Sequence, residues 1–138
     1  MVPEFSRPER LARPPPEVRV VASAAECAAL ARRLGLPAIA SLACRFRLVP
    51  AAQGAVHAEG KLEAVVAQVC VASGEVFEAL VAERFVVRFV PAGSEDPEPD
   101  LADDDEIPCV GETMDLGEAA AEQLALALDP YPRAPGAA

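Results

Sequence analysis

Three long runs of alternating apolar and polar residues, joined by short connections, constrain the fold of this chain more than any other feature. The first run, residues 41–50, places Leu, Cys, Phe and Leu at alternate positions and ends at Pro50. Side chains on a strand point alternately to the two faces of a sheet. A period of two therefore predicts a strand with one buried face.

The other two runs extend this pattern. Residues 56–71 alternate at first and then become apolar at nearly every position, which predicts a strand with one end covered on both faces. Gly60 interrupts this run and is a candidate bulge. A Ser73–Glu75 turn typical of a hairpin leads into the third run, residues 77–89. Short turns between three long strands predict an antiparallel meander.

Two helices are expected beside these strands. The first, residues 23–35, has Ser23 and Glu26 at the spacing of a capping box, and Gly35 suits a left-handed residue at its end. The second, residues 115–129, repeats that spacing and has a broad apolar face with a narrow acidic stripe. The first helix should therefore have one buried face, and the second should pack on the sheet, on a partner, or on both.

Together these elements predict an α+β fold. It has an antiparallel sheet of three long strands, one or two short strands, and two packed helices. Residues 1–16, rich in Pro and Arg, should form an extended arm, and residues 17–138 should form one domain. Within that domain the acidic segment 92–108 is expected to be a mobile, disordered loop, and residues 130–138 an extended tail.

Charge is distributed very unevenly along the chain, whose net charge is −10. Residues 1–50 carry eight Arg and four Glu, residues 51–92 carry three basic and five acidic groups, and residues 93–138 carry one Arg and thirteen acids. An acidic C-terminal third repels phosphate backbones and attracts basic proteins. The alternative is that these acids only confer solubility.

The C-terminal third supplies the candidate residues for binding a basic partner. They are Asp103, Asp104, Asp105, Glu106, Glu118, Glu122, Tyr131 and Arg133. For Tyr131 the alternative is that its ring fixes the tail on the core. The four consecutive acids lack the ligand spacing and the turn Gly of a calcium loop, so we expect no metal site and no cofactor.

A smaller basic region lies near the N-terminus and gives candidate RNA contacts. These are Arg7, Arg10, Arg13, Arg45 and Arg47. The alternative is an ordinary solvated arm and strand face. No basic surface interleaved with aromatic residues is visible, so a stacking platform for RNA bases is not expected.

Catalysis finds little support in the sequence. The single His, His57, is expected on the polar face of its strand, and Cys70 lies in an apolar run that should make its thiol unreactive. The Gly residues form no nucleotide-binding motif. A small hydrolase using His57 or Cys70 is the weakest alternative, and no small-molecule substrate is expected.

The four Cys are too far apart for a metal-ligand motif, with gaps of 17, 26 and 39 positions. The N-terminus is polar and Pro-rich, and no apolar stretch approaches the length of a membrane span. We therefore expect reduced thiols in a cytoplasmic protein that does not enter a membrane.

Three segments together resemble the YceD family, the large ribosomal RNA subunit accumulation proteins, in its alphaproteobacterial form. They are EFSRP from Glu4 to Pro8, the stretch Leu62–Pro91, and the stretch Met114–Ala137. The most specific parts are QVC at residues 68–70 and the DLGE and DPYPR motifs of the last stretch. The resemblance implies a role in 23S ribosomal RNA accumulation and large-subunit assembly, with no catalytic activity.

The resemblance leaves the partner open. Other branches of the family often carry a C-x-R-C pattern, whereas Ser73 stands in that neighbourhood here, so a thiol-pair or metal role does not carry over. Because the chain is acidic, we favour binding of a basic large-subunit ribosomal protein or assembly factor over direct contact with 23S RNA by the basic arm and strand. A protein adaptor unrelated to ribosomes is the alternative.

Overall fold

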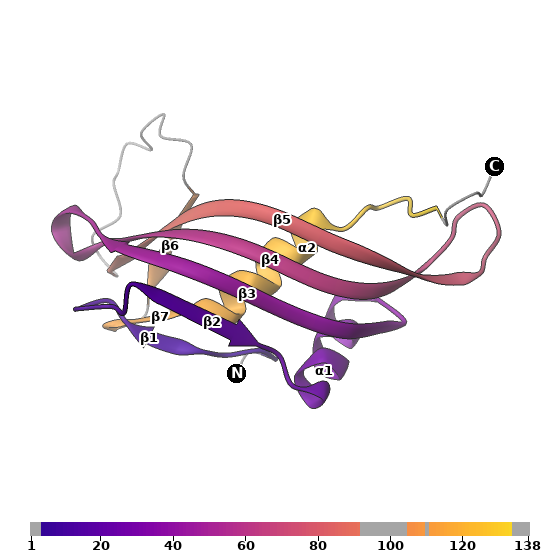
Figure 1. Ribbon diagram of the computed structural model, residues 1–138, viewed down its shortest axis with the longest axis horizontal. Helices are drawn as coiled ribbons and strands as arrows, with labels where there is room; N and C mark the ends of the chain where they lie inside the picture. The colour runs from indigo at the N-terminus through magenta and orange to yellow at the C-terminus, as the bar shows by residue number, and fades with distance from the viewer. Residues whose placement is uncertain (1–3, 92–104, 110, 134–138) are drawn as a thin grey trace.

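A five-stranded sheet forms the body of the computed structural model, which describes residues 4–91, 105–109 and 111–133 (Figure 1). Its strands lie in the order β2 (Glu17–Val21), β3 (Ala38–Pro50), β4 (Val56–Val69), β5 (Val76–Pro91) and β6 (Asp105–Cys109). Neighbours from β2 to β5 are antiparallel, and β6 runs parallel to β5. The predicted α+β fold with its meander of three long strands is confirmed.

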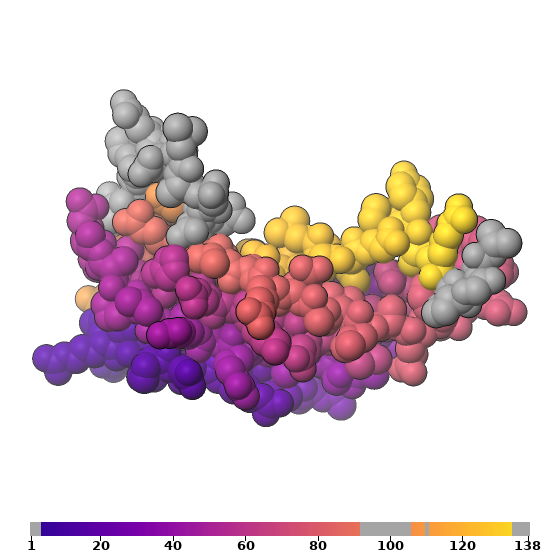
Figure 2. Space-filling view, turned by 45° about the horizontal axis from the view of Figure 1, so that its top comes forward, coloured from indigo at the N-terminus to yellow at the C-terminus, as the bar shows by residue number. Residues whose placement is uncertain are grey.

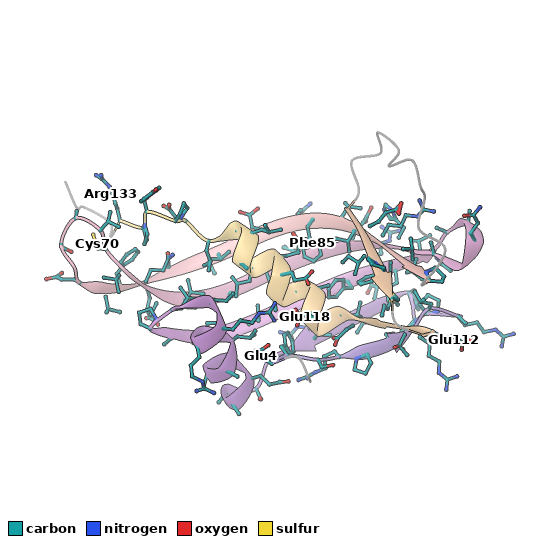
Figure 3. All side chains as sticks on the ribbon, turned by 180° about the vertical axis from the view of Figure 1, so that it is seen from behind. Glu4, Cys70, Phe85, Glu112, Glu118 and Arg133 are labelled. Atoms are coloured by element: carbon teal, nitrogen blue, oxygen red, sulfur yellow. The ribbon has the colours of Figure 1, made fainter. Side chains whose placement is uncertain are left out.

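The remaining elements lie against one face of this sheet. They are α1 (Ala24–Leu34), α2 (Leu116–Ala127), and a two-stranded ribbon of β1 (Pro8–Arg10) and β7 (Thr113–Asp115); a 3-10 turn, η1 (Ala52–Gly54), joins β3 to β4. Seen from behind, α2 crosses the long strands diagonally, with α1 beside it (Figure 3). On the opposite face, toward the viewer in Figure 1, the described residues form no helix.

The core lies between this covered face and the helices. The largest side chains that are almost fully buried come from the N-terminal segment, the sheet and both helices: Phe5, Phe46, Phe89, Leu30, Leu42, Leu62, Met114, Leu116 and Leu124. Burial of aliphatic and aromatic side chains of this size stabilises a fold by about 1.5–3 kcal/mol each. The period-two runs predicted this face correctly.

The caps of α1 follow the predicted chemistry. Ser23 and Glu26 form a reciprocal capping box, and Gly35 is left-handed with φ 69°. At α2, Asp115 accepts the N–H of Glu118, but the carboxylate of Glu118 binds Arg33 on α1. Thus the Asp115 side chain caps α2, while the Glu118 side chain connects α2 to α1.

Gly60 does not mark a bulge. It lies in regular register between Phe46 and Phe85, and the register shift in β3 falls between Ile39 and Ser41 instead. A Cβ at Gly60 would lie 2.1 Å from the ring of Phe85, which packs edge-on against Phe46. The glycine therefore makes room for an aromatic ring on the covered face.

The acidic segment was expected to be a loop up to residue 108. Residues 92–104 lie outside the described residues, but Asp105–Cys109 form β6. Ile107 packs against the core and Cys109 is buried within it, which gives this short strand apolar anchors. Pro108 is tolerated because β6 is an edge strand.

Candidate functional site

The N-terminal EFSRP segment is clasped to the start of α2. Asp115 accepts hydrogen bonds from the Ser6 hydroxyl at 2.6 Å and from the Arg7 N–H at 2.8 Å, and the N–H of Leu116 donates to the Arg7 carbonyl. A Cβ on Gly117 would lie 2.6 Å from the carbonyl oxygen of Phe5. Two of the motifs that carry the family resemblance thus hold each other in place.

Two ion pairs extend this clasp to α1. Arg7 binds Glu26 through both nitrogens, at 2.6 and 2.7 Å, and its guanidinium lies over the Phe5 ring. The hydrogen bond from Arg7 lowers the pKa of Glu26 to about 2. Arg33 binds Glu118 in the same bidentate way, which raises the pKa of Arg33.

The QVC and DPYPR motifs contact each other directly after the end of α2. The Gln68 side chain, the only polar one among the buried described residues, donates to the carbonyl of Asp129. The N–H of Val71 donates to the carbonyl of Pro132 at 2.9 Å. Cys70 and Arg133 lie at this same end of the molecule in Figure 3. The QVC and DPYPR motifs therefore dock on each other.

This docked C-terminal segment stands between two clefts. Figure 2 shows it, in yellow, continuing from α2 along the surface. A cleft of about 310 Å³ separates it from Phe77–Glu83 of β5, and one of about 560 Å³ separates it from the Leu34–Pro37 turn. Tyr131 is 74% exposed, so its ring does not fix the segment to the core.

The other acidic candidates are scattered. Asp103 and Asp104 lie outside the described residues, Asp105 is the first residue of β6, and Glu106 lies 3.9 Å from Arg88 across the β5–β6 pair. Glu122 is exposed and lines a cleft of about 460 Å³ that Glu118 also lines. Partial burial and the charge of Glu118 raise the pKa of Glu122.

The basic candidates also separate. Arg7 is held in the clasp, whereas Arg10 and Arg13 are exposed on the N-terminal segment. Arg45 and Arg47 are exposed on the open face of β3. Arg47 lies between Glu17 and Glu59 in register, so opposite charges flank it.

Arg45 belongs to a row of cations that no sequence motif marks. Its register partners are Arg19 on β2 and Lys61 on β4, and Lys61 is paired with Arg84 on β5. All four side chains are exposed on the face that carries no helix. The period-two runs place each of these residues on the polar face of its strand. Only the pairing register of the four strands shows that they lie side by side.

The candidate catalytic groups are far apart. His57 lies near the start of β4 and Cys70 directly follows its end, about 40 Å away at about 3.3 Å per residue. Cys70 is buried and lines the larger cleft beside the tail, where Asp129 accepts the Tyr131 N–H. The one His of the chain cannot serve this thiol as a base.

The other thiols are buried in apolar surroundings, which raises the pKa of Cys27, Cys109 and, to about 12, Cys44. Within residues 4–91, 105–109 and 111–133, no group of three or more metal-ligating side chains comes together. None of the helices described is long and apolar enough to cross a membrane.

Comparison with known proteins gave one match. A family model described as "Large ribosomal RNA subunit accumulation protein YceD" matches residues 58–138, which is more than half of the chain. No curated protein and no solved structure matches. The matched residues include most of β4, all of β5, the QVC and DPYPR motifs and all of α2, whereas β2 and β3, with Arg19 and Arg45, lie outside them.

Proposed function

The chain belongs to the YceD family, and from this premise we propose that it is a non-enzymatic assembly factor that supports 23S ribosomal RNA accumulation in the cytoplasm. It acts by binding a basic ribosomal protein of the large subunit, or a basic assembly factor. Its acidic C-terminal third supplies the attraction, and 23S RNA is a second contact.

The observation that carries this proposal is an exposed aromatic side chain on a fixed backbone. Tyr131 is 74% exposed, while hydrogen bonds to Gln68 and Val71 anchor the residues on either side of it. An aromatic side chain that is already positioned loses little entropy on binding and is a frequent hot spot of protein interfaces. Arg133 lies two residues further on the same segment.

Charge assists this contact by bringing the partner to it. Thirteen acids and one Arg fall in residues 93–138, and Glu122 is exposed on α2. Exposed charges are screened beyond about 8 Å at physiological salt, so the attraction should act mainly on the association rate. Short-range contacts at Tyr131 then provide specificity.

Depletion of the protein in its own cells tests the function. We expect fewer large subunits in a sedimentation profile, and normal levels would contradict the proposal and favour an adaptor unrelated to ribosomes. Purification of the tagged full chain at low and moderate salt, with and without ribonuclease, tests the partner. A basic ribosomal protein or assembly factor should remain bound after ribonuclease treatment.

Tyr131→Ala provides the site-specific arm of that purification. It should reduce recovery of the basic protein without changing the thermal midpoint, because the ring contacts solvent. Glu78→Gln, an exposed change on β5, is the matched control and should leave recovery unchanged. Complete loss of the protein partner with ribonuclease, together with no effect of Tyr131→Ala, would show that the partner is RNA-bridged and the proposal wrong.

A further inference from the structure

The open face of the sheet carries four cations in one row. Arg19, Arg45, Lys61 and Arg84 occupy paired positions on four adjacent strands, β2 to β5, and all four are exposed. Neighbouring strands are about 4.8 Å apart, so the row is about 14 Å long. Each of the four lies near the middle of its strand.

The three arginines of this row have no carboxylate close beside them in the described part of the chain. Among the described residues, no carboxylate lies within 4.0 Å of the guanidinium of Arg19, Arg45 or Arg84. Lys61 has Glu63 at 3.9 Å on its own strand. On the other side of the sheet, by contrast, Arg7 and Arg33 each bind a carboxylate through two nitrogens.

The row is also unfavourable for folding. Like charges directly opposite one another across paired strands destabilise a sheet, and this row contains three such pairs in succession. The adjacent row alternates instead, with Arg47 between Glu17 and Glu59. This sheet can therefore hold a row in which positive and negative side chains alternate. The stability of the fold does not explain why all four charges of the cationic row are positive.

The shape of the face suits a phosphate backbone. Ala43 is a small residue beside the row, and together with Arg19, Arg45 and Lys61 it lines a hollow of about 240 Å³, with the carboxylate of Glu63 as the one acidic group in the lining. A nucleic-acid backbone carries one negative charge per nucleotide, so the four cations of the row can each meet one phosphate.

From these observations we infer that the row of Arg19, Arg45, Lys61 and Arg84 binds the phosphate backbone of RNA. The inference rests on the proposed function, which places the protein near ribosomal RNA, and it gives the open face a separate role from the C-terminal segment. Phe46, Phe85 and Phe89 pack in or against the core on the covered face, so their rings are not available to stack on bases at the open face. Binding should therefore depend on backbone charge with little preference for base sequence.

Charge reversal at the centre of the row provides the test. Arg45→Glu places a carboxylate between Arg19 and Lys61, so it replaces two like-charge pairs with two opposite-charge pairs. Its thermal midpoint should equal or exceed that of the wild type. Arg32→Glu, an exposed reversal on α1, changes the net charge by the same amount and is the matched control.

Fluorescence anisotropy with a labelled RNA duplex of mixed sequence, at salt concentrations from about 50 to 200 mM, measures the binding. The wild-type affinity should fall with a log–log slope of about −3 to −4, since four phosphates are neutralised. Arg45→Glu should weaken binding at least about tenfold and reduce the steepness of the slope by about one or more. Arg32→Glu should stay within about twofold of the wild type, because a distant charge is screened.

Equal losses for the two variants would overturn the inference, because they would reflect net charge alone. So would a wild type that binds polyglutamate or anionic lipid vesicles as tightly as RNA, or that binds no RNA. If RNA binding fails while depletion still lowers large-subunit levels, the inference falls and the proposed function stands. If RNA binds through the row but depletion leaves the ribosome profile normal, the proposed function fails instead.

Discussion

The two faces of the sheet use their charged residues differently. On the helix side, Arg7 and Arg33 each bind a carboxylate at 2.6–3.2 Å and connect the N-terminal segment, α1 and α2. On the open face, Arg19, Arg45 and Arg84 belong to a row of cations and have no described carboxylate within 4.0 Å. The first set of charges helps to assemble the chain, and the second remains available to a partner.

The two sets of charged residues also differ in how visible they are in the sequence. The EFSRP and DLGE motifs, which are among the segments that resemble the family, are engaged in the clasp and stabilise the fold. The cationic row is invisible as a motif because its members are 16 to 26 positions apart in the sequence. A segment can thus carry a family resemblance through its structural role, while the surface that we propose for RNA binding carries no sequence motif.

The largest effect is expected from Phe5→Ala on the helix side. The Phe5 side chain is completely buried, so its removal should lower the free energy of unfolding by about 3–5 kcal/mol. Urea denaturation followed by circular dichroism measures this change. Tyr131→Ala, which removes an exposed ring, should stay within about 0.5 kcal/mol of the wild type. A loss below about 1 kcal/mol for Phe5→Ala would mean that the N-terminal segment is not part of the core.

Gly117→Ala tests the close approach of the clasp to α2. Its Cβ would meet backbone atoms of Phe5 and Arg7 at 2.6–3.0 Å, so the N-terminal segment would have to move. We expect a loss of about 1–3 kcal/mol in the same denaturation experiment. Ala125→Ser, an exposed change on the same helix, is the control. Equal stabilities of the two variants would contradict this packing.

A smaller effect concerns pH and the Arg7–Glu26 ion pair. The pKa of Glu26 is lowered from 4.5 to about 2, mainly by its hydrogen bonds with Arg7, so the pair stabilises the fold above about pH 4.5 and this contribution disappears as the pH falls toward 2. Glu26→Gln should be about 1–2 kcal/mol less stable at neutral pH, because the capping box and the pair are both weakened.

Urea denaturation of both proteins between about pH 7 and pH 2 checks the direction of that effect. The stability difference should shrink as the pH falls from about 4.5, because protonated Glu26 also lacks its charge. A difference that stays constant over this range would show that the charge of Glu26 contributes nothing.

The smallest change in stability is expected on the open face. Arg84→Gln removes one member of the row and one like-charge pair with Lys61, so its free energy of unfolding should stay within about 0.5 kcal/mol of the wild type. Urea denaturation measures it alongside the helix-side variants. A loss comparable to that of Gly117→Ala would mean that the row stabilises the sheet, and the contrast between the two faces would be lost.

Features set by neighbouring residues could be predicted from the sequence. The caps of α1 at Ser23 and Gly35 depend on residues within one turn of the helix. The long strands could be predicted because their period of two is local. The role of Gly60, which makes room for an aromatic ring, could not be predicted, because it depends on Phe85 from the next strand.

Contacts between residues far apart in the sequence also decided which candidate site residues could be predicted. Arg7 was predicted to contact RNA, but Glu26 lies beside it in the structure although it is 19 positions away in the sequence. Arg45 was predicted as part of a basic region near the N-terminus, whereas its neighbours Arg19 and Arg84 appear only once the register is known. A sequence pattern shows which face a side chain occupies, and the pairing of strands shows what it has beside it.

Complementation of depleted cells with Arg45→Glu tests the central claim most directly, namely that the open face serves large-subunit RNA accumulation while the helix side holds the fold. The account predicts that this variant accumulates to the wild-type level but leaves large subunits depleted in the sedimentation profile, whereas Arg32→Glu restores them. Full restoration of large subunits by Arg45→Glu would contradict it.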